Sequence, residues 1–165
     1  EEKERPILNQ FDGFLVTSNF TKQYLESKGI AKPIFCIEPA LDYTFSKDQR
    51  FFDRVEAIMV ANFIKRKGIL PFLQLLEKYP THNFQIKIYG STHFEASYAK
   101  ECLNLIDKLP EVTYGGELPQ DQLFKAYEKA NLFISTAFME TFGMAIQEAK
   151  NADLPLLLLN GGNAK

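Results

Sequence analysis

The sequence contains no tryptophan, only two cysteines and no long hydrophobic run. Its longest apolar run, residues 154–159, is far shorter than the roughly 18 residues that a membrane-spanning helix needs. Cys36 and Cys102 form no Cys-x-x-Cys pair, which argues against a disulfide-rich miniprotein and predicts two reduced, buried thiols.

An excess of charge of one sign is also lacking, because 19 basic and 21 acidic side chains give a net charge of −2. Such a chain has no overall attraction for nucleic acid, so we expect no nucleic-acid partner. His82 and His93 have no further ligands at metal-binding spacing, so we expect no metal site. The glycine-rich dinucleotide fingerprint, the P-loop and the nucleophile elbow of α/β-hydrolases are absent from the sequence.

What is present is a soluble composition with an alternating hydrophobic pattern. The 165 residues are 45% apolar and 24% charged, which suits one domain with a sizeable core or one domain plus a fragment. Helical stretches separate most of the predicted strands, which are residues 13–17, 34–37, 57–60, 84–89, 112–114, 132–135 and 155–159. This alternation predicts an α/β fold, a Rossmann-like parallel sheet with helices on both faces. Residues 156–159, all leucine, suit a central strand covered on both sides.

The chain divides into three parts by composition. Residues 39–54 are polar and aromatic without a period, which indicates a linker or surface loop. Residues 1–38 then form a strand–helix–strand tail of another unit, and residues 55–165 form the main domain. Because the sequence starts without methionine, we expect a piece of a longer protein.

Candidate site residues follow the predicted strands, where open parallel sheets bind their ligands. Three cations and a glycine, residues 65–68, stand at the start of a helix and suit an anion site, although a solvated basic turn is the alternative. Gly90 and the pair at 115–116 suit close approach of a ligand or tight turns alone.

The richest segment lies at residues 136–149. Thr141 is the expected N-cap of a helix, with its first amide groups open to an anion. Glu140 precedes that helix, and Glu148 is expected about two turns inside it. Their carboxylates can accept hydrogen bonds from sugar hydroxyls. The alternatives are an acid that only favours the helix dipole at Glu140 and a solvated helix face at Glu148.

Together these residues resemble the donor-binding half of retaining glycosyltransferases with the GT-B fold, of the group 1, family 4-like type. The match is Glu140-Thr141-Phe142-Gly143, then Glu148-Ala149, with seven residues between the glutamates. Lys67, Gly90 and Gly116 fall in the family's order. Residues 11–22 look like the end of its N-terminal acceptor domain. Residues 37–42 look like its hinge, with Pro-Ala replacing Asn-Gly.

The resemblance implies a role for each matching residue. Lys67 would neutralise the donor diphosphate, and Glu140 would contact the sugar, so these two are the implied catalytic residues. Glu148 would hold the ribose. Asn62 stands where the family often has arginine, and Arg66 is the suggested substitute. Glu117 and Leu118 would border the base. The remaining implied donor-binding residues are Gly90, Thr141, and the backbone of Phe142, Gly143 and Met144.

As a whole, the resemblance implies transfer of a hexose, with retention, from a nucleotide sugar to a glycan or lipid-linked acceptor in polysaccharide biosynthesis. It implies no metal or other cofactor, and a cytoplasmic protein with peripheral membrane association through the rest of the N-terminal domain. The fragment alone is expected to bind nucleotide and transfer poorly. Two alternatives stay open, a non-catalytic nucleotide-sugar binding module and a sugar-nucleotide epimerase on the same scaffold.

Overall fold

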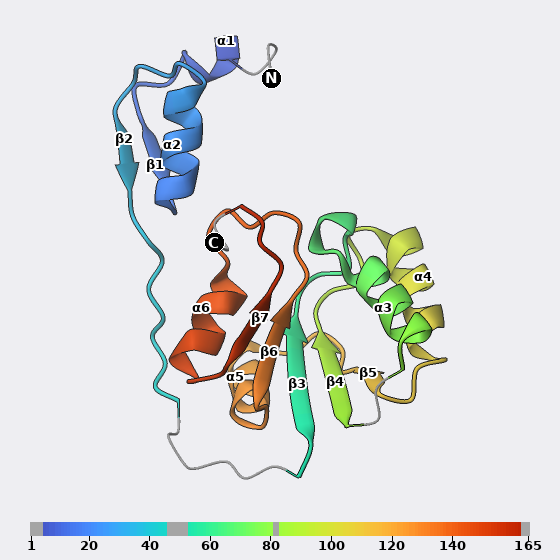
Figure 1. Ribbon diagram of the computed structural model, residues 1–165. Helices are drawn as coiled ribbons and strands as arrows, with labels where there is room; N and C mark the ends of the chain where they lie inside the picture. The colour runs from blue at the N-terminus through green and yellow to red at the C-terminus, as the bar shows by residue number, and fades with distance from the viewer. Residues whose placement is uncertain (1–4, 46–52, 81–82, 163–165) are drawn as a thin grey trace.

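The structure is a computed structural model that describes residues 5–45, 53–80 and 83–162. Figure 1 shows a small N-terminal unit, an extended segment and a larger unit built around a sheet. None of the described helices is long and apolar enough to cross a membrane.

The small unit is built on a parallel pair of short strands. Its elements are α1 (Arg5–Leu8), β1 (Phe14–Val16), α2 (Asn19–Ser27) and β2 (Ile34–Cys36). Strand β1 pairs in parallel with β2, and α2 connects them. Ser18 caps α2 by accepting a hydrogen bond from the Thr21 amide.

The large unit contains a five-stranded sheet in the order β5-β4-β3-β6-β7, and every pair in it is parallel. The predicted α/β fold with a Rossmann-like parallel sheet is therefore confirmed. The elements are β3 (Val55–Val60), the short 3-10 helix η1 (Lys65–Lys67), α3 (Ile69–Lys78), β4 (Phe84–Tyr89), α4 (Ala96–Ile106), β5 (Val112–Tyr114), α5 (Gln120–Glu128), β6 (Leu132–Ser135), α6 (Met144–Asn151) and β7 (Leu156–Leu158).

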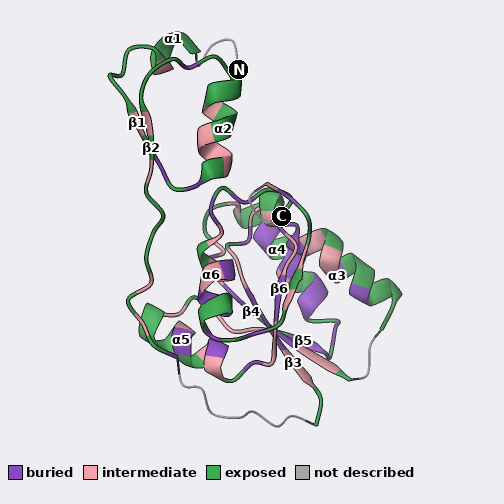
Figure 2. Ribbon diagram, turned by 60° about the vertical axis from the view of Figure 1, so that its left-hand side comes forward, coloured by how far each residue is buried: buried purple, intermediate pink, exposed green. Residues whose placement is uncertain are grey.

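Two helices cover each face of this sheet. Successive side chains of a strand point to opposite faces, so one strand can contribute to both cores. On β3, Ala57 and Met59 pack into one core with residues of α3 and α4. Ile58, between them, packs into a second core with residues of α5 and α6. Figure 2 shows buried residues along the helices and strands of the large unit.

The direction of the chain across the sheet reverses between β3 and β6. From β3 the chain moves outward to β4 and β5, then returns to place β6 and β7 on the other side of β3. Such a reversal leaves a crevice at the carboxyl ends of the two central strands. The loops that follow β3 and β6 therefore meet at the same point.

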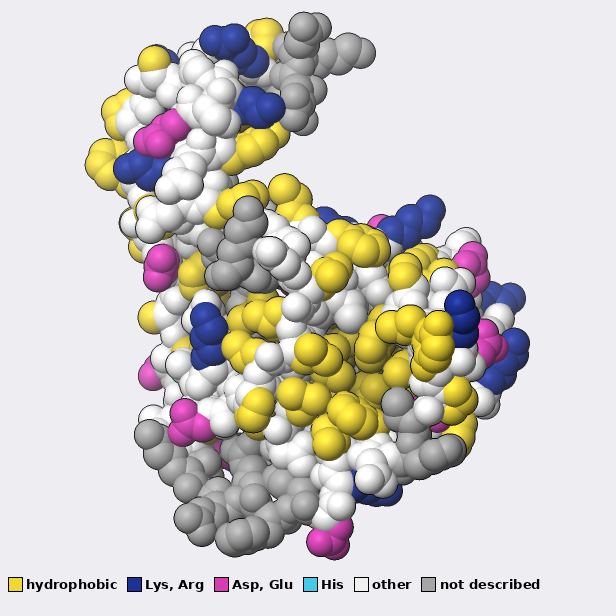
Figure 3. All heavy atoms as spheres, in the orientation of Figure 1, with side chains coloured by type: hydrophobic (Ala, Val, Ile, Leu, Met, Phe, Trp, Pro, Cys, Tyr) yellow, Lys and Arg dark blue, Asp and Glu magenta, His cyan; other side chains and the backbone are white. Residues whose placement is uncertain are grey.

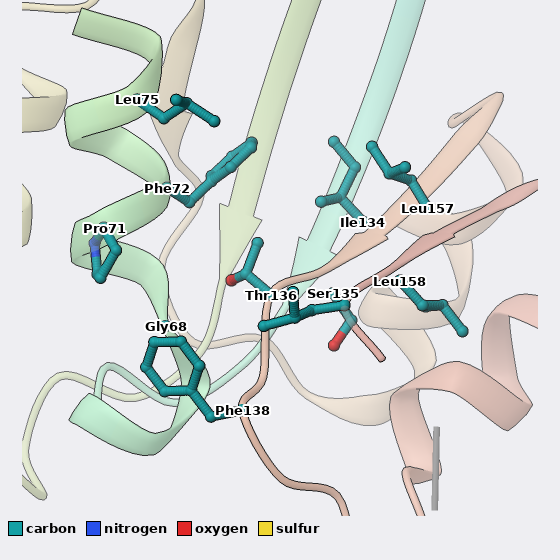
Figure 4. A pocket seen from close by; sticks show the side chains of 11 residues that line it. Gly68, Pro71, Phe72, Leu75, Ile134, Ser135, Thr136, Phe138, Leu157 and Leu158 are labelled. Atoms are coloured by element: carbon teal, nitrogen blue, oxygen red, sulfur yellow. The ribbon is translucent and has the colours of Figure 1, made fainter. Parts of the chain in front are cut away.

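Strand β7 is an edge strand of the described sheet, so the prediction of a central strand covered on both faces is wrong. Leu157 is 54% exposed. With Ile134 and Phe72 it lines an apolar cavity of about 380 Å³ between α3 and the strands β6 and β7 (Figure 4). Hydrophobic side chains gather on this face in Figure 3. An all-leucine run cannot show whether a strand lies inside a sheet or at its edge.

The segment before the large unit packs more closely than a polar surface loop would. Phe45 is buried against α5, with its ring 5.4 Å from that of Phe124 in an edge-on arrangement. The Tyr43 ring lies 4.2 Å from the same Phe124 ring. Aromatic burial therefore fastens this part of the linker to the second core. Residues 46–52 of the predicted linker lie outside the described residues.

Candidate functional site

The reversal point of the sheet holds an ion pair between two predicted site residues. Lys67, at the end of η1 after β3, places its Nζ 2.6 Å from Oε1 of Glu140, in the loop after β6. Their side chains are only 18% and 10% exposed. Residues 73 positions apart are thus brought together, in an environment where solvent screens charge weakly.

Backbone contacts hold this ion pair in place. Gly68 has φ +65°, and a Cβ on it would lie 2.2 Å from the Thr136 carbonyl oxygen, so only glycine allows the two loops to cross here. The Thr136 hydroxyl donates to the Lys67 carbonyl at 2.8 Å. The Phe138 amide donates to the Arg66 carbonyl at 3.0 Å. These hydrogen bonds therefore hold η1 against the loop after β6.

The three cations of η1 have different surroundings. Lys65 and Arg66 are exposed, whereas Lys67 is half-buried. The Arg66 guanidinium donates to the Met139 carbonyl at 2.6 Å, which gives it a structural contact beside the predicted donor role. A solvated basic turn therefore describes Lys65, whereas Arg66 is exposed but hydrogen-bonded to the chain and Lys67 is half-buried in the ion pair.

Asn62 and Gly90 belong to a second group of interlocked loops. Asn62 Oδ1 accepts a hydrogen bond from the Ser91 amide at 3.2 Å. Gly90 has φ +147°, and a Cβ there would lie 2.1 Å from the Ala61 carbonyl oxygen. The Gly90 amide donates to the Gly116 carbonyl at 3.1 Å. These contacts show that Gly90 is needed for close packing of the loops after β3, β4 and β5.

The two residues predicted to border the base follow β5. Glu117 is exposed, and Leu118 is half-buried against the second core. Both lie at the carboxyl end of the sheet, as the predicted site requires. Their contact with a base stays a prediction.

The predicted cap of α6 is wrong. The N-cap is Gly143, in the left-handed conformation with φ +84°, and the helix begins at Met144. Thr141 is exposed, and its carbonyl accepts a hydrogen bond from the Ser18 hydroxyl at 2.5 Å, which links the small unit to this loop. The first helical amide groups are therefore those of Met144 and the residue after it, while Phe142 is buried before the helix.

Glu148 is 8% exposed, which makes the solvated-face interpretation wrong. It is the fifth residue of α6, little more than one turn from the start rather than two. Tyr127 of α5 donates its hydroxyl to Glu148 Oε2 at 2.8 Å. Burial raises the pKa of the Glu148 carboxyl, and the hydrogen bond from Tyr127 lowers it by less. The two glutamates thus have different partners, one on η1 and the other on α5.

Tyr127, a buried side chain of α5, is not among the site residues predicted from the sequence. The signal that could have singled it out is chemical, because a buried tyrosine hydroxyl needs a hydrogen-bond partner. His93 is exposed, and His82 lies outside the described residues. Over the described ranges, no three histidine, cysteine or acidic side chains form a group that could hold a metal. The expectation of no metal stays a prediction.

The family described as "Glycosyl transferases group 1" matches residues 44–165. This range contains the large unit, the ion pair and both glutamates. No curated protein matches the sequence.

Solved structures share the fold at low identity. A sucrose-phosphate synthase from Thermosynechococcus elongatus superposes with a TM-score of 0.81 at 22% identity, over 100% of this chain and 46% of that one. A glycosyltransferase from Rickettsia africae gives 0.76 at 17% identity, over 99% and 49%. The Anabaena protein HepE, in complex with UDP-glucose, gives 0.76 at 20% identity, over 96% and 48%. The chain therefore spans about half the length of these proteins.

Proposed function

The chain belongs to the group 1 glycosyl transferases, and on that premise we propose that it binds the donor for retaining transfer of a hexose from a nucleotide sugar. The observation that carries the proposal is the Lys67–Glu140 pair at the reversal point of the sheet, beside the start of α6. One side chain there offers positive charge, and the other accepts hydrogen bonds.

Lys67 has the chemistry to stabilise a leaving nucleoside diphosphate. When the bond to the sugar breaks, negative charge grows on the diphosphate oxygens, and a fixed ammonium group favours that state. An ammonium has three N–H donors, and the bond to Glu140 uses one of them. The first amide groups of α6 add partial positive charge at the same edge. Because this charge comes from the chain, we expect donor binding to withstand removal of divalent cations by a chelator.

The two carboxylates suit the hydroxyl groups of a donor. Glu140 would accept from the transferred sugar and keep its anomeric carbon in a reactive pose. Glu148, buried and held by Tyr127, would accept from the ribose. HepE and the pneumococcal transferase GtfA have structures with UDP-glucose and with UDP and GlcNAc, respectively, which supports a nucleoside diphosphate sugar as the ligand class.

The same proposal leads to expectations for the acceptor and for the cellular location. We expect a glycan or lipid-linked acceptor bound opposite the large unit, as in polysaccharide biosynthesis. We also expect a cytoplasmic protein that associates peripherally with the membrane. The 165 residues alone should bind the donor and transfer poorly, because acceptor contacts would come from the rest of such an enzyme.

Calorimetric titration with UDP-glucose, GDP-mannose and ADP-glucose tests the proposal. We expect saturable binding of one donor class and little turnover by this chain, with affinity unchanged by a chelator. A flat response to all three donors would contradict donor binding. In a longer protein, Glu140→Gln should abolish transfer while donor affinity is kept. Sugar product formed from donor alone would instead indicate an epimerase.

A further inference from the structure

Tyr127 is a buried polar group that packing alone does not explain. Its side chain is completely buried. Its ring packs against Phe133, with centroids 6.1 Å apart, and edge-on to Phe45 at 6.2 Å. A phenylalanine would fill this aromatic cluster without the desolvation of a hydroxyl, which costs free energy unless the hydroxyl is hydrogen-bonded.

The Tyr127 hydroxyl donates its hydrogen bond to a candidate site residue, Glu148. It lies 2.8 Å from Glu148 Oε2 and 3.3 Å from the Ala145 carbonyl oxygen. A hydroxyl has one hydrogen to donate, and the shorter contact to a carboxylate is the stronger one. The donor comes from α5 and the acceptor from α6, so this bond also connects two helices on one face of the sheet.

A carboxylate with one oxygen held cannot turn freely. Rotation of the carboxylate about its last C–C bond would break the hydrogen bond from Tyr127 to Oε2, so this bond favours one orientation of the carboxylate and of Oε1. Preorganisation of this kind matters most for a group that must accept hydrogen bonds from paired ligand hydroxyls. A carboxylate that rotated in the free protein would have to be ordered at each binding event, and this ordering costs free energy.

We propose that Tyr127 is a positioning residue that orients the Glu148 carboxylate toward the ribose hydroxyls of the donor. The inference rests on the proposed function, because it assumes that a nucleoside diphosphate binds beside α6. It adds a residue that touches no ligand and acts only through Glu148.

The test compares ribose with deoxyribose in two proteins. Affinities are measured by calorimetry for the nucleoside diphosphate that binds, and for its 2′-deoxy and 3′-deoxy forms. In the unchanged chain, loss of the recognised hydroxyl should weaken binding about tenfold, the cost of one hydrogen bond to a charged group. In Tyr127→Phe, the ribose and deoxyribose forms should differ by about threefold or less. Equal ribose preference in both proteins would overturn the inference.

Two controls separate positioning from folding. Tyr98→Phe removes another buried hydroxyl, one that accepts from the Leu70 amide in the other core, and it should keep the full ribose preference. Inorganic pyrophosphate should bind Tyr127→Phe and the unchanged chain equally. Weaker binding of pyrophosphate and of all nucleotides by the same factor would mean a merely structural role and would overturn the inference.

A second variant keeps the test decisive if Tyr127→Phe does not fold. Glu148→Gln retains an oxygen that can accept from Tyr127, and it turns an NH2 group toward the ligand. It should lose affinity for the ribose form and little for the deoxy form, whereas equal losses would contradict an oriented Oε1. If no nucleoside diphosphate binds the unchanged chain, the proposed function fails with it. If one binds with ribose preference insensitive to Tyr127, only this inference fails.

Discussion

At the scale of single residues, the two buried glutamates differ in the group that contacts the carboxylate. Glu140 lies against the ammonium of Lys67, whereas Glu148 lies against the neutral hydroxyl of Tyr127. The first carboxylate has a compensating charge and the second has only a hydrogen bond. Substitutions at the two positions should therefore change stability in different ways.

Removing the Lys67 ammonium should leave the buried Glu140 carboxylate without an opposite charge beside it. We expect Lys67→Met to lower the free energy of unfolding by about 3 kcal/mol, because a buried charge is left without its partner. The double variant Lys67→Met/Glu140→Gln should regain much of this loss, since no charge stays buried. Urea denaturation of the three proteins measures the difference. A double variant no more stable than the single one would show that the pair is not coupled.

Glu148 should make stability depend on pH. Burial raises the pKa of Glu148 above its ordinary 4.5. As pH rises from about that value, the unfolded chain releases this proton before the folded one, so the charge destabilises the fold. Glu148→Gln carries no such charge. The stability of Glu148→Gln relative to the unchanged chain should grow as pH rises from 4.5 through the raised pKa. A difference that stays constant between about pH 4 and 8 would contradict this.

The sequence could indicate Lys67 and Glu140 because both follow strands, and loops after parallel strands share one edge. It could not place the cap of α6. A left-handed Gly143 and a capping Thr141 are equally consistent with the local residues, and the contact of Thr141 with Ser18 is tertiary. The hydrogen bond from Tyr127 to Glu148 could not be predicted for the same reason, because the two residues lie on different helices.

At the scale of elements, the bounds of β4, β5 and β6 agree with the hydrophobic pattern. Strands are short runs of β-branched and aromatic residues, which the pattern detects well. The position of β7 at the sheet edge was not predictable, because strand order depends on long-range pairing. The loops between elements are fixed by glycines that no periodicity describes.

The crossing of the loops after β3 and β6 should be sensitive to one methyl group. Gly68→Ala places a Cβ against the Thr136 carbonyl oxygen in addition to left-handed strain. Gly116→Ala has similar strain, with φ +83°, and its Cβ would meet nothing within 4 Å. We expect about 1 kcal/mol of destabilisation for Gly116→Ala and about 1–3 kcal/mol more for Gly68→Ala. Equal thermal shifts of the two variants would show that the loops do not cross closely.

At the scale of the whole molecule, the sheet has one apolar region that the described helices leave open. Leu75 and Phe138 are 53% and 54% exposed and line the same cavity as Leu157 (Figure 4). Exposed apolar patches next to an unpaired strand edge favour association. This region was missed from the sequence because its leucines predict burial wherever they occur.

A charge on β7 should reduce such association. We expect Leu157→Lys to lower self-association and the binding of a hydrophobic dye, with the free energy of unfolding changed by less than about 0.5 kcal/mol. Phe94→Lys is the matched control, because Phe94 is 71% exposed and does not line the cavity. Sedimentation velocity and dye fluorescence give the readout. Equal behaviour of both variants and the unchanged chain would mean that the open face does not drive association.

The proposed function depends most on Lys67, which at the reversal point of the sheet would bind the diphosphate of a nucleotide. Its most direct test is titration of Lys67→Ala with the preferred nucleoside diphosphate and with the bare nucleoside. The diphosphate should lose about tenfold or more in affinity, the cost of a hydrogen bond to a charged group, and the nucleoside should change by less than about twofold. Lys65→Ala, in the same short helix and exposed, should leave both affinities unchanged. Equal losses for diphosphate and nucleoside in Lys67→Ala would contradict the claim.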